Sequence, residues 1–135
     1  MEKVNSERAK RFNKGKPPLD LLPLDMLTGL ARVLEMGEKK YGRNNWRKGA
    51  PATEQVACLL RHLQPVMEVL NADKGAEFLF DTESGLPHVD HILFNVISLR
   101  LALETEHGIP RDPQSSSNIE PKVLNKVLDT SGGGC

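Results

Sequence analysis

The sequence lacks several features that mark other classes of protein. No run of about eighteen apolar residues occurs in the 135-residue chain, so a transmembrane helix is not expected. The N-terminal segment MEKVNSERAKRFNKGK has no apolar centre and is not typical of a secretory signal. Lys and Arg together number 18, as do Asp and Glu, so the formal net charge is zero. We therefore expect no general affinity for nucleic acids or membrane surfaces.

Cysteine and aromatic residues are also scarce. The two cysteines, Cys58 and Cys135, do not form a zinc-cluster pattern, and this usage is typical of the reducing cytoplasm. Aromatic residues make up 4% of the chain, yet the single Trp46 and the single Tyr41 lie in one short stretch. That stretch is therefore the first place to look for a functional site.

This stretch begins with an amphipathic helix that carries two acidic residues. Four apolar residues recur at helical spacing and define a core-facing stripe: Leu27, Leu30, Ala31 and Leu34. Glu35 and Glu38 continue the stripe by one turn. Two carboxylates on an inward face are costly unless a cation binds them, so the pattern predicts a divalent metal site. The alternative is a wetter helix end at which both face solvent and pair with Arg32 or Lys39.

Apolar periodicity predicts three long helices, and no segment alternates as a strand would. They span about Leu24–Lys40, Thr53–Asn71 and Pro87–Glu106. Pro65 should kink the second helix, because proline cannot donate the backbone hydrogen bond that a helix interior requires. The sequence thus predicts an all-α fold.

The predicted core draws on broad apolar faces of the second and third helices. The residues assigned to it are Val56, Leu59, Leu60, Leu63, Val66, Met67, Leu70, Val89, Ile92, Leu93, Val96, Ile97 and Leu101. One neighbouring helix cannot cover faces this wide, so we expect a homodimer or homotetramer. The predicted domain covers residues 1–110, and residues 111–135 should form a linker, a short helix over 121–128 and a flexible tail.

Basic residues gather around the loop that follows the first helix. The group consists of Lys39, Lys40, Arg43, Arg47 and Lys48. Cationic groups beside carboxylates suit an anionic ligand that brings a metal, such as a triphosphate. Lys16, next to Gly15 in the N-terminal arm, could also approach a phosphate. A solvated loop and a solvated tail are the alternatives.

Polar residues of the second and third helices are further candidates. Arg61 and His62 lie at the edge of the apolar face of the second helix, although a surface pair would look the same. The third helix carries a polar stripe that steps by three or four residues: His88, His91, Asn95 and Ser98. Such a stripe is either a wet surface or the wall of a site. An acidic loop over residues 72–86 could supply more cation ligands.

Four segments, taken in order over roughly residues 11–106, resemble one family. They are RFNKGKPPLDLLP, EMGEKKYGRNNWRKG, LLRHL and DTESGLPHVDHILFN. They look like the phage and bacterial dATP/dGTP diphosphohydrolases, which are MazG-like members of the all-α nucleoside triphosphate pyrophosphohydrolases. The likeness is greatest to the phage MazZ type, which is associated with 2-aminoadenine genomes.

The resemblance implies a MazG-like helical bundle that requires Mg²⁺ or Mn²⁺. It implies cleavage of a deoxypurine triphosphate, dGTP and as a second substrate dATP, to the monophosphate and pyrophosphate. The dGMP would supply 2-aminoadenine nucleotide synthesis, in the host cytoplasm if a phage encodes the protein.

The resemblance also implies ligands for the metal. The wider superfamily carries Glu-x-x-Glu on one helix, which Glu35 and Glu38 match, and Glu-x-x-Asp on the next, which has no clean match here. Asp81 is our choice for a further ligand, with three alternatives left open: Glu54, Glu68 and Glu77.

Residue chemistry indicates how the remaining polar groups would bind the substrate. Four cations are candidates for the phosphates: Lys16, Lys40, Arg47 and Arg61. Trp46 could stack on the purine while Asn45 or Asn95 reads its edge. The three histidines His62, His88 and His91 complete the predicted substrate-binding set.

Two other functions compete with this hypothesis. The first is a histidine-metal phosphohydrolase that uses His62, His88, Asp90 and His91. Such enzymes usually carry a His-Asp dipeptide, whereas this chain has the reverse order at Asp90-His91. The second is a nucleotide-binding or assembly protein without catalytic activity.

Overall fold

A computed structural model describes residues 8–114 of the chain. It contains three α-helices, namely α1 (Thr28–Tyr41), α2 (Ala52–Ala72) and α3 (His88–His107). This part of the chain holds no β-strand, only an isolated antiparallel bridge between Phe80 and Pro87. The prediction of an all-α fold is confirmed. The helix predicted over 121–128 and the predicted tail lie outside the described residues.

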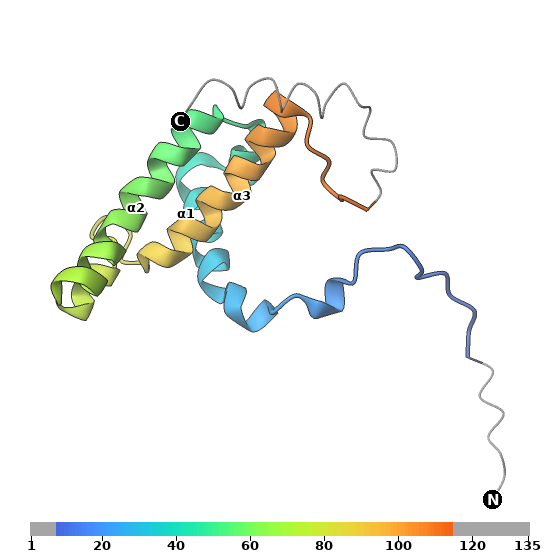
Figure 1. Ribbon diagram of the computed structural model, residues 1–135, viewed down its shortest axis with the longest axis horizontal. Coiled ribbons are helices and arrows are strands. Elements are labelled where there is room, and N and C mark those ends of the chain that lie inside the picture. Colours follow the sequence, from blue (N-terminus) through green and yellow to red (C-terminus); the bar gives the residue numbers. More distant parts are fainter. Residues whose placement is uncertain (1–7, 115–135) are drawn as a thin grey trace, which may run out of the picture.

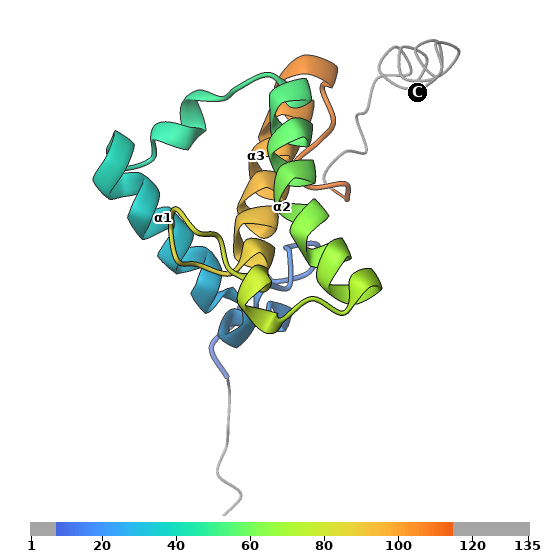
Figure 2. The same cartoon turned by 90° about the vertical axis from the view of Figure 1, so that its left-hand side faces the viewer.

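Helix α3 is the central element of the bundle. It packs mainly against α2, which runs beside it in the opposite direction, and it also contacts α1 (Figure 1). Figure 2 shows α1 and α2 on either side of α3, with the loop after α1 crossing from one to the other. None of the described helices is long and apolar enough to cross a membrane.

The helix ends follow local sequence signals. A short 3₁₀ turn, η2 (Leu24–Leu27), precedes α1, so the segment predicted as the first turn of the helix is wound more tightly. Gly108 ends α3 in the left-handed region at φ 68°, where glycine is favoured because it lacks a Cβ. Helix α2 runs unbroken through Pro65, and Figure 2 shows its axis changing direction along its length.

The buried face of α3 is the polar one. His88, His91, Asn95 and Ser98 are each at most 8% exposed, whereas Val89 is 60% exposed. The assignment of Val89 and Val96 to the core was therefore wrong for the single chain, because α3 turns its polar stripe toward α1 and α2. The stripe is therefore not a wet surface, and its role as the wall of a site stays a prediction.

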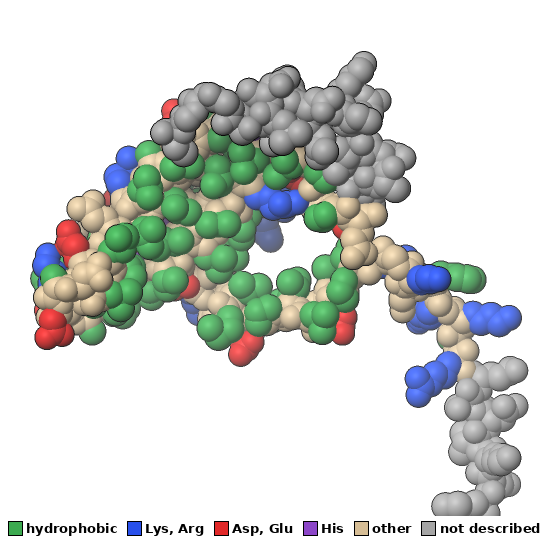
Figure 3. All heavy atoms as spheres, in the orientation of Figure 1, with side chains coloured by type: hydrophobic (Ala, Val, Ile, Leu, Met, Phe, Trp, Pro, Cys, Tyr) green, Lys and Arg blue, Asp and Glu red, His purple; other side chains and the backbone are tan. Residues whose placement is uncertain are grey.

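The apolar face of α2 is largely uncovered. Val56, Leu60, Met67 and Leu70 are all exposed, and no residue of α2 is buried. The clean buried face predicted for this helix is therefore not formed among residues 8–114. Figure 3 shows hydrophobic side chains gathered over the face that α2 and α3 present together.

Close contact between α1 and α3 depends on a glycine. A Cβ placed on Gly29, in the first turn of α1, would collide with the carboxylate of Asp90 on α3. A negative charge near the N-terminus of a helix is favourable, because the exposed amide groups there carry partial positive charge. Asp90 is thus directed at α1.

Candidate functional site

A cavity of about 870 Å³ lies between α1, the basic loop and the inner sides of α2 and α3. Helix α1 contributes its last three turns, including both predicted acidic residues. The loop contributes its 3₁₀ turn η3 (Asn45–Lys48), and α2 and α3 contribute polar side chains from their facing surfaces. Eight predicted site residues line it together: Glu35, Glu38, Asn45, Trp46, Arg47, His62, His91 and Asn95.

The two acidic residues of α1 reach the cavity from its open side. Glu35 and Glu38 are exposed, so they do not lie in the core as the stripe predicted. They lie in the C-terminal half of α1. Glu35 pairs with Arg32 at 3.2 Å between Nη1 and Oε1, which is the alternative predicted for this residue. Both carboxylates nevertheless line the cavity, where a cation could reach them.

The only tryptophan of the chain is fixed by aromatic and cationic neighbours. Trp46 meets Phe94 of α3 edge to face, with ring centroids 6.2 Å apart and planes at 83°. The Arg47 guanidinium lies 4.6 Å from the centre of the indole ring. This cation–π contact places the positive charge of Arg47 over one face of the indole, and both residues line the cavity.

Buried polar groups of α3 form the opposite wall. Asn95 and Ser98 are 7% and 5% exposed, and both line the cavity. The Ser98 hydroxyl has no hydrogen-bond partner among the described residues. An unsatisfied buried hydroxyl is costly, so a ligand that supplies a partner would gain binding energy there.

Three histidines form a second cluster next to the cavity. His62 of α2 and His88 of α3 face each other with their Nδ1 atoms 2.9 Å apart. The ring of His91 stacks on that of His62, with centroids 4.5 Å apart and planes nearly parallel at 5°. Asp81 joins them from the acidic loop, with its Oδ2 3.8 Å from His91 Nε2.

The acidic loop that carries Asp81 is closed by its own hydrogen bonds. The Asp81 amide donates to Leu86 O at 2.8 Å, and the Ser84 amide donates to Asp81 Oδ2 at 2.9 Å. Ser84 also contacts His91, with 2.7 Å between its Oγ and His91 Nε2. The loop therefore delivers a positioned carboxylate to the histidines.

The charges of this cluster follow from its partial burial. Burial, with the positive forms of His91 and His88 nearby, lowers the pKa of His62 below its ordinary value. Burial likewise lowers the pKa of His91, although the Asp81 carboxylate opposes this. Burial works to raise the pKa of Asp81, but hydrogen bonds from Ser84 outweigh it and lower that pKa. These shifts favour uncharged imidazoles at His62 and His91 and an ionised carboxylate at Asp81.

Several predicted residues lie elsewhere. Lys16 is exposed on the N-terminal arm, and neither Lys40 nor Arg61 lines the cavity. Lys40 pairs with Glu83 at 3.2 Å, which raises the pKa of the lysine. Arg61 lies 3.1 Å from the sulfur of Cys58. Their roles in binding phosphate stay predictions.

Two residues that were not predicted take part in the cavity wall and in the histidine cluster. Phe94 supports Trp46, and Ser84 positions Asp81 and His91, yet neither was predicted from sequence. The spacing Asp81-x-x-Ser84 before Gly85 is a turn signal that pointed to Ser84, because such aspartates accept backbone hydrogen bonds. Phe94 follows His91 by three residues and so shares its helix face.

Comparison with known proteins places the chain in a family. Residues 6–110 match the family model described as "dATP/dGTP diphosphohydrolase, N-terminal". The chain belongs to this family. The diphosphohydrolase resemblance seen in the sequence is therefore confirmed for most of the described residues.

A relative of this family comes from a phage. The "dATP/dGTP diphosphohydrolase" of Salmonella phage PMBT28 is 37% identical over 81 residues, which cover 60% of this chain. The chain spans about a quarter of the length of that relative, since the match covers 25% of it. No solved structure matches the chain significantly.

Proposed function

We propose that this member of the family hydrolyses a deoxypurine nucleoside triphosphate to the monophosphate and pyrophosphate with a divalent cation. The preferred substrate would be dGTP, with dATP as a second. The supporting observation is the cavity, which surrounds one space with an acidic pair, a cation beside an aromatic ring and buried polar groups. Its volume of about 870 Å³ is in the range of small-molecule sites.

The residues on the α1 side fit a hard divalent cation. Glu35 and Glu38 are oxygen donors one helical turn apart, which suits Mg²⁺ or Mn²⁺. The pair between Arg32 and Glu35 is exposed and contributes little, so it does not prevent a cation from binding. A cation held there would neutralise phosphate charge and lower the pKa of a bound water.

The chain's own side chains would bind and orient the nucleotide. Arg47 carries a planar cation suited to phosphate oxygens, and Trp46 offers its ring to the base. Stacking of this kind is worth about 1–3 kcal/mol per base, which is too little for strict choice of purine. Asn45, Asn95 and the unpaired Ser98 hydroxyl would add hydrogen bonds that a wrong base leaves unmade.

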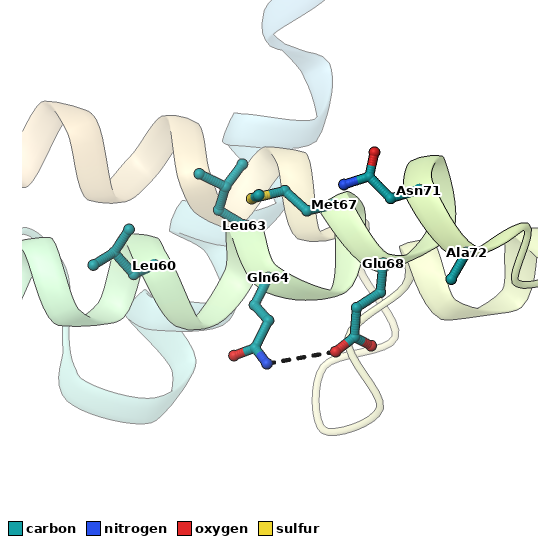
Figure 4. Close-up of a pocket in the computed structure, with 7 residues that line it drawn as sticks. All are labelled: Leu60, Leu63, Gln64, Met67, Glu68, Asn71 and Ala72. Carbon is teal, nitrogen blue, oxygen red and sulfur yellow. Dashed lines mark hydrogen bonds between the residues drawn. The ribbon is translucent and has the colours of Figure 1, made fainter.

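We also infer that the chain acts as a homodimer or homotetramer. The uncovered apolar residues of α2 border a groove of about 460 Å³, which Figure 4 shows along Leu60, Leu63 and Met67. Exposed apolar faces of this breadth are typical of association surfaces. A second copy would cover them.

The proposed product, dGMP, suggests a metabolic role. Release of dGMP in the cytoplasm would supply the synthesis of 2-aminoadenine nucleotides, if the chain acts as the MazZ type does. This role depends on dGTP being the preferred substrate, so the substrate assay tests both.

The test is an assay of each deoxynucleoside triphosphate with Mn²⁺ or Mg²⁺, followed by chromatography of the products. We expect dGMP and pyrophosphate from dGTP, slower cleavage of dATP, and little cleavage of dCTP or dTTP. Release of dGDP and orthophosphate would overturn the assigned bond. Equal rates on dCTP would overturn the purine preference, and no hydrolysis at all would favour a binding protein.

A further inference from the structure

The contact between His62 and His88 has the dimensions of two ligands on one metal ion. Imidazole nitrogens bind divalent transition-metal ions at about 2.0–2.1 Å, so two of them lie about 2.9 Å apart at the right angle of an octahedral site and about 3.3–3.4 Å apart at the tetrahedral angle that Zn²⁺ prefers. The two Nδ1 atoms are 2.9 Å apart. A simple hydrogen bond between two neutral rings gives a similar distance. The two histidines alone therefore do not distinguish a hydrogen bond from a metal site, and a third donor is needed.

That third donor is Asp81. One ligand atom each of His62, Asp81 and His88 lies within 4.8 Å of the other two, close enough for a small adjustment to bring all three onto one ion. The three residues come from α2, the acidic loop and the start of α3, so tertiary packing brings them together. His88 is only 8% exposed, which leaves its ring little freedom to turn away.

Neighbouring groups orient these donors. The Ser84 amide donates to Asp81 Oδ2, and the Ser84 hydroxyl contacts His91, whose ring stacks on His62. Outer hydrogen bonds and stacking of this kind fix the direction of metal ligands in proteins. Because hydrogen bonds already hold the donors in place, less order is lost when an ion binds.

We propose that His62, Asp81 and His88 bind one divalent transition-metal ion. Two imidazoles and a carboxylate suit Mn²⁺, Co²⁺, Ni²⁺ or Zn²⁺ and are a poor match for Mg²⁺, which prefers oxygen. The site is separate from the Glu35/Glu38 pair and goes beyond the proposed function. Since His62 also lines the cavity, the ion would lie next to the space assigned to the nucleotide.

The lowered pKa of His62 agrees with this assignment. A metal binds only the neutral form of imidazole, and burial lowers the pKa of His62, which favours that form. The ionised Asp81 supplies the negative charge that a divalent cation requires.

The test is a titration of the full chain with Co²⁺ alone, followed by visible absorption and by isothermal calorimetry. We expect one ion per chain to give the spectrum of nitrogen and oxygen ligands, in addition to any ion that Glu35 and Glu38 bind. His62→Asn and Asp81→Asn should each weaken binding by at least about tenfold, since even outer partners of metal sites contribute that much. The matched control is His107→Asn, which removes an exposed histidine at the end of α3 and should leave binding unchanged.

Three further measurements make the outcome decisive. Circular dichroism must show unchanged helix content in each variant, and Ser84→Ala, outside the donor set, should weaken binding less than Asp81→Asn. Glu38→Gln should keep the Co²⁺ spectrum even if it loses hydrolysis. Co²⁺ binding without any hydrolysis of dGTP would support this site and overturn the proposed function. If the wild type and His62→Asn bound Co²⁺ equally, or if neither bound it, the cluster would be a set of hydrogen-bonded histidines and not a metal site.

Discussion

Trp46 stands on edge against Phe94, with ring centroids 6.2 Å apart, and this contact joins the basic loop to α3. Edge-to-face pairs of this kind are worth about 0.5–1.5 kcal/mol beyond the area they bury. The contact holds the indole on the cavity wall beside Arg47. The aromatic ring and the cation therefore keep a defined position relative to the carboxylates of α1.

Replacing Trp46 should weaken nucleotide binding more than catalysis. We expect Trp46→Leu to raise KM for dGTP by about 5- to 150-fold, which corresponds to the loss of about 1–3 kcal/mol of stacking. Steady-state kinetics would measure this. Phe78→Leu is the control, because Phe78 is an exposed aromatic residue of η4 (Ala76–Leu79) that does not line the cavity. An unchanged KM in Trp46→Leu would show that the indole does not bind the nucleotide.

Glu38→Gln should abolish turnover while the fold stays intact. The substitution removes a charged oxygen ligand without changing side-chain size, and Glu38 is exposed, so helix content should not change. Glu54→Gln is the comparison, since Glu54 was an alternative ligand but does not line the cavity. Pyrophosphate release and circular dichroism would report both effects. Full activity in Glu38→Gln would contradict the metal assignment, and loss of activity in Glu54→Gln would restore the alternative.

Ser98→Ala should separate stability from binding. The hydroxyl is buried without a partner among the described residues, so its removal should raise the free energy of unfolding by about 1 kcal/mol. The same change should raise KM if the hydroxyl contacts the nucleotide. Urea denaturation and kinetics on one preparation would test this. Ser84→Ala should instead lower the free energy of unfolding, because the Ser84 hydroxyl contacts His91 and accepts a hydrogen bond from the Leu86 amide. If both variants lost stability equally, the Ser98 hydroxyl would not be an unsatisfied buried group.

Charges placed on the outer face of α2 should dissociate the protein. Leu60 and Met67 are about half exposed in the single chain, and a glutamate at either position would be buried in an interface. We expect the wild type to sediment as a dimer or tetramer at micromolar concentration and Leu60→Glu/Met67→Glu to sediment as a monomer. A monomeric wild type would refute the association.

The sequence alone was enough to predict the helices. Their apolar periodicity, the proline and glycine at their ends and the absence of strand alternation are local signals, and all three helices lie within a few residues of the predicted bounds. The sequence also singled out Glu35, Glu38 and Trp46, and all three line the cavity.

Only the tertiary structure decided which side of each helix faces inward. Periodicity identifies an apolar face, but burial depends on what covers that face, and within residues 8–114 the outer side of α2 and Val89 of α3 stay exposed. The polar stripe of α3 is buried instead, where the histidines contact one another and Asn95 and Ser98 line the cavity. The meeting of His62, Asp81 and His88 likewise needed the packing of α2 on α3, because residues 26 positions apart, such as His62 and His88, have no local signal that joins them.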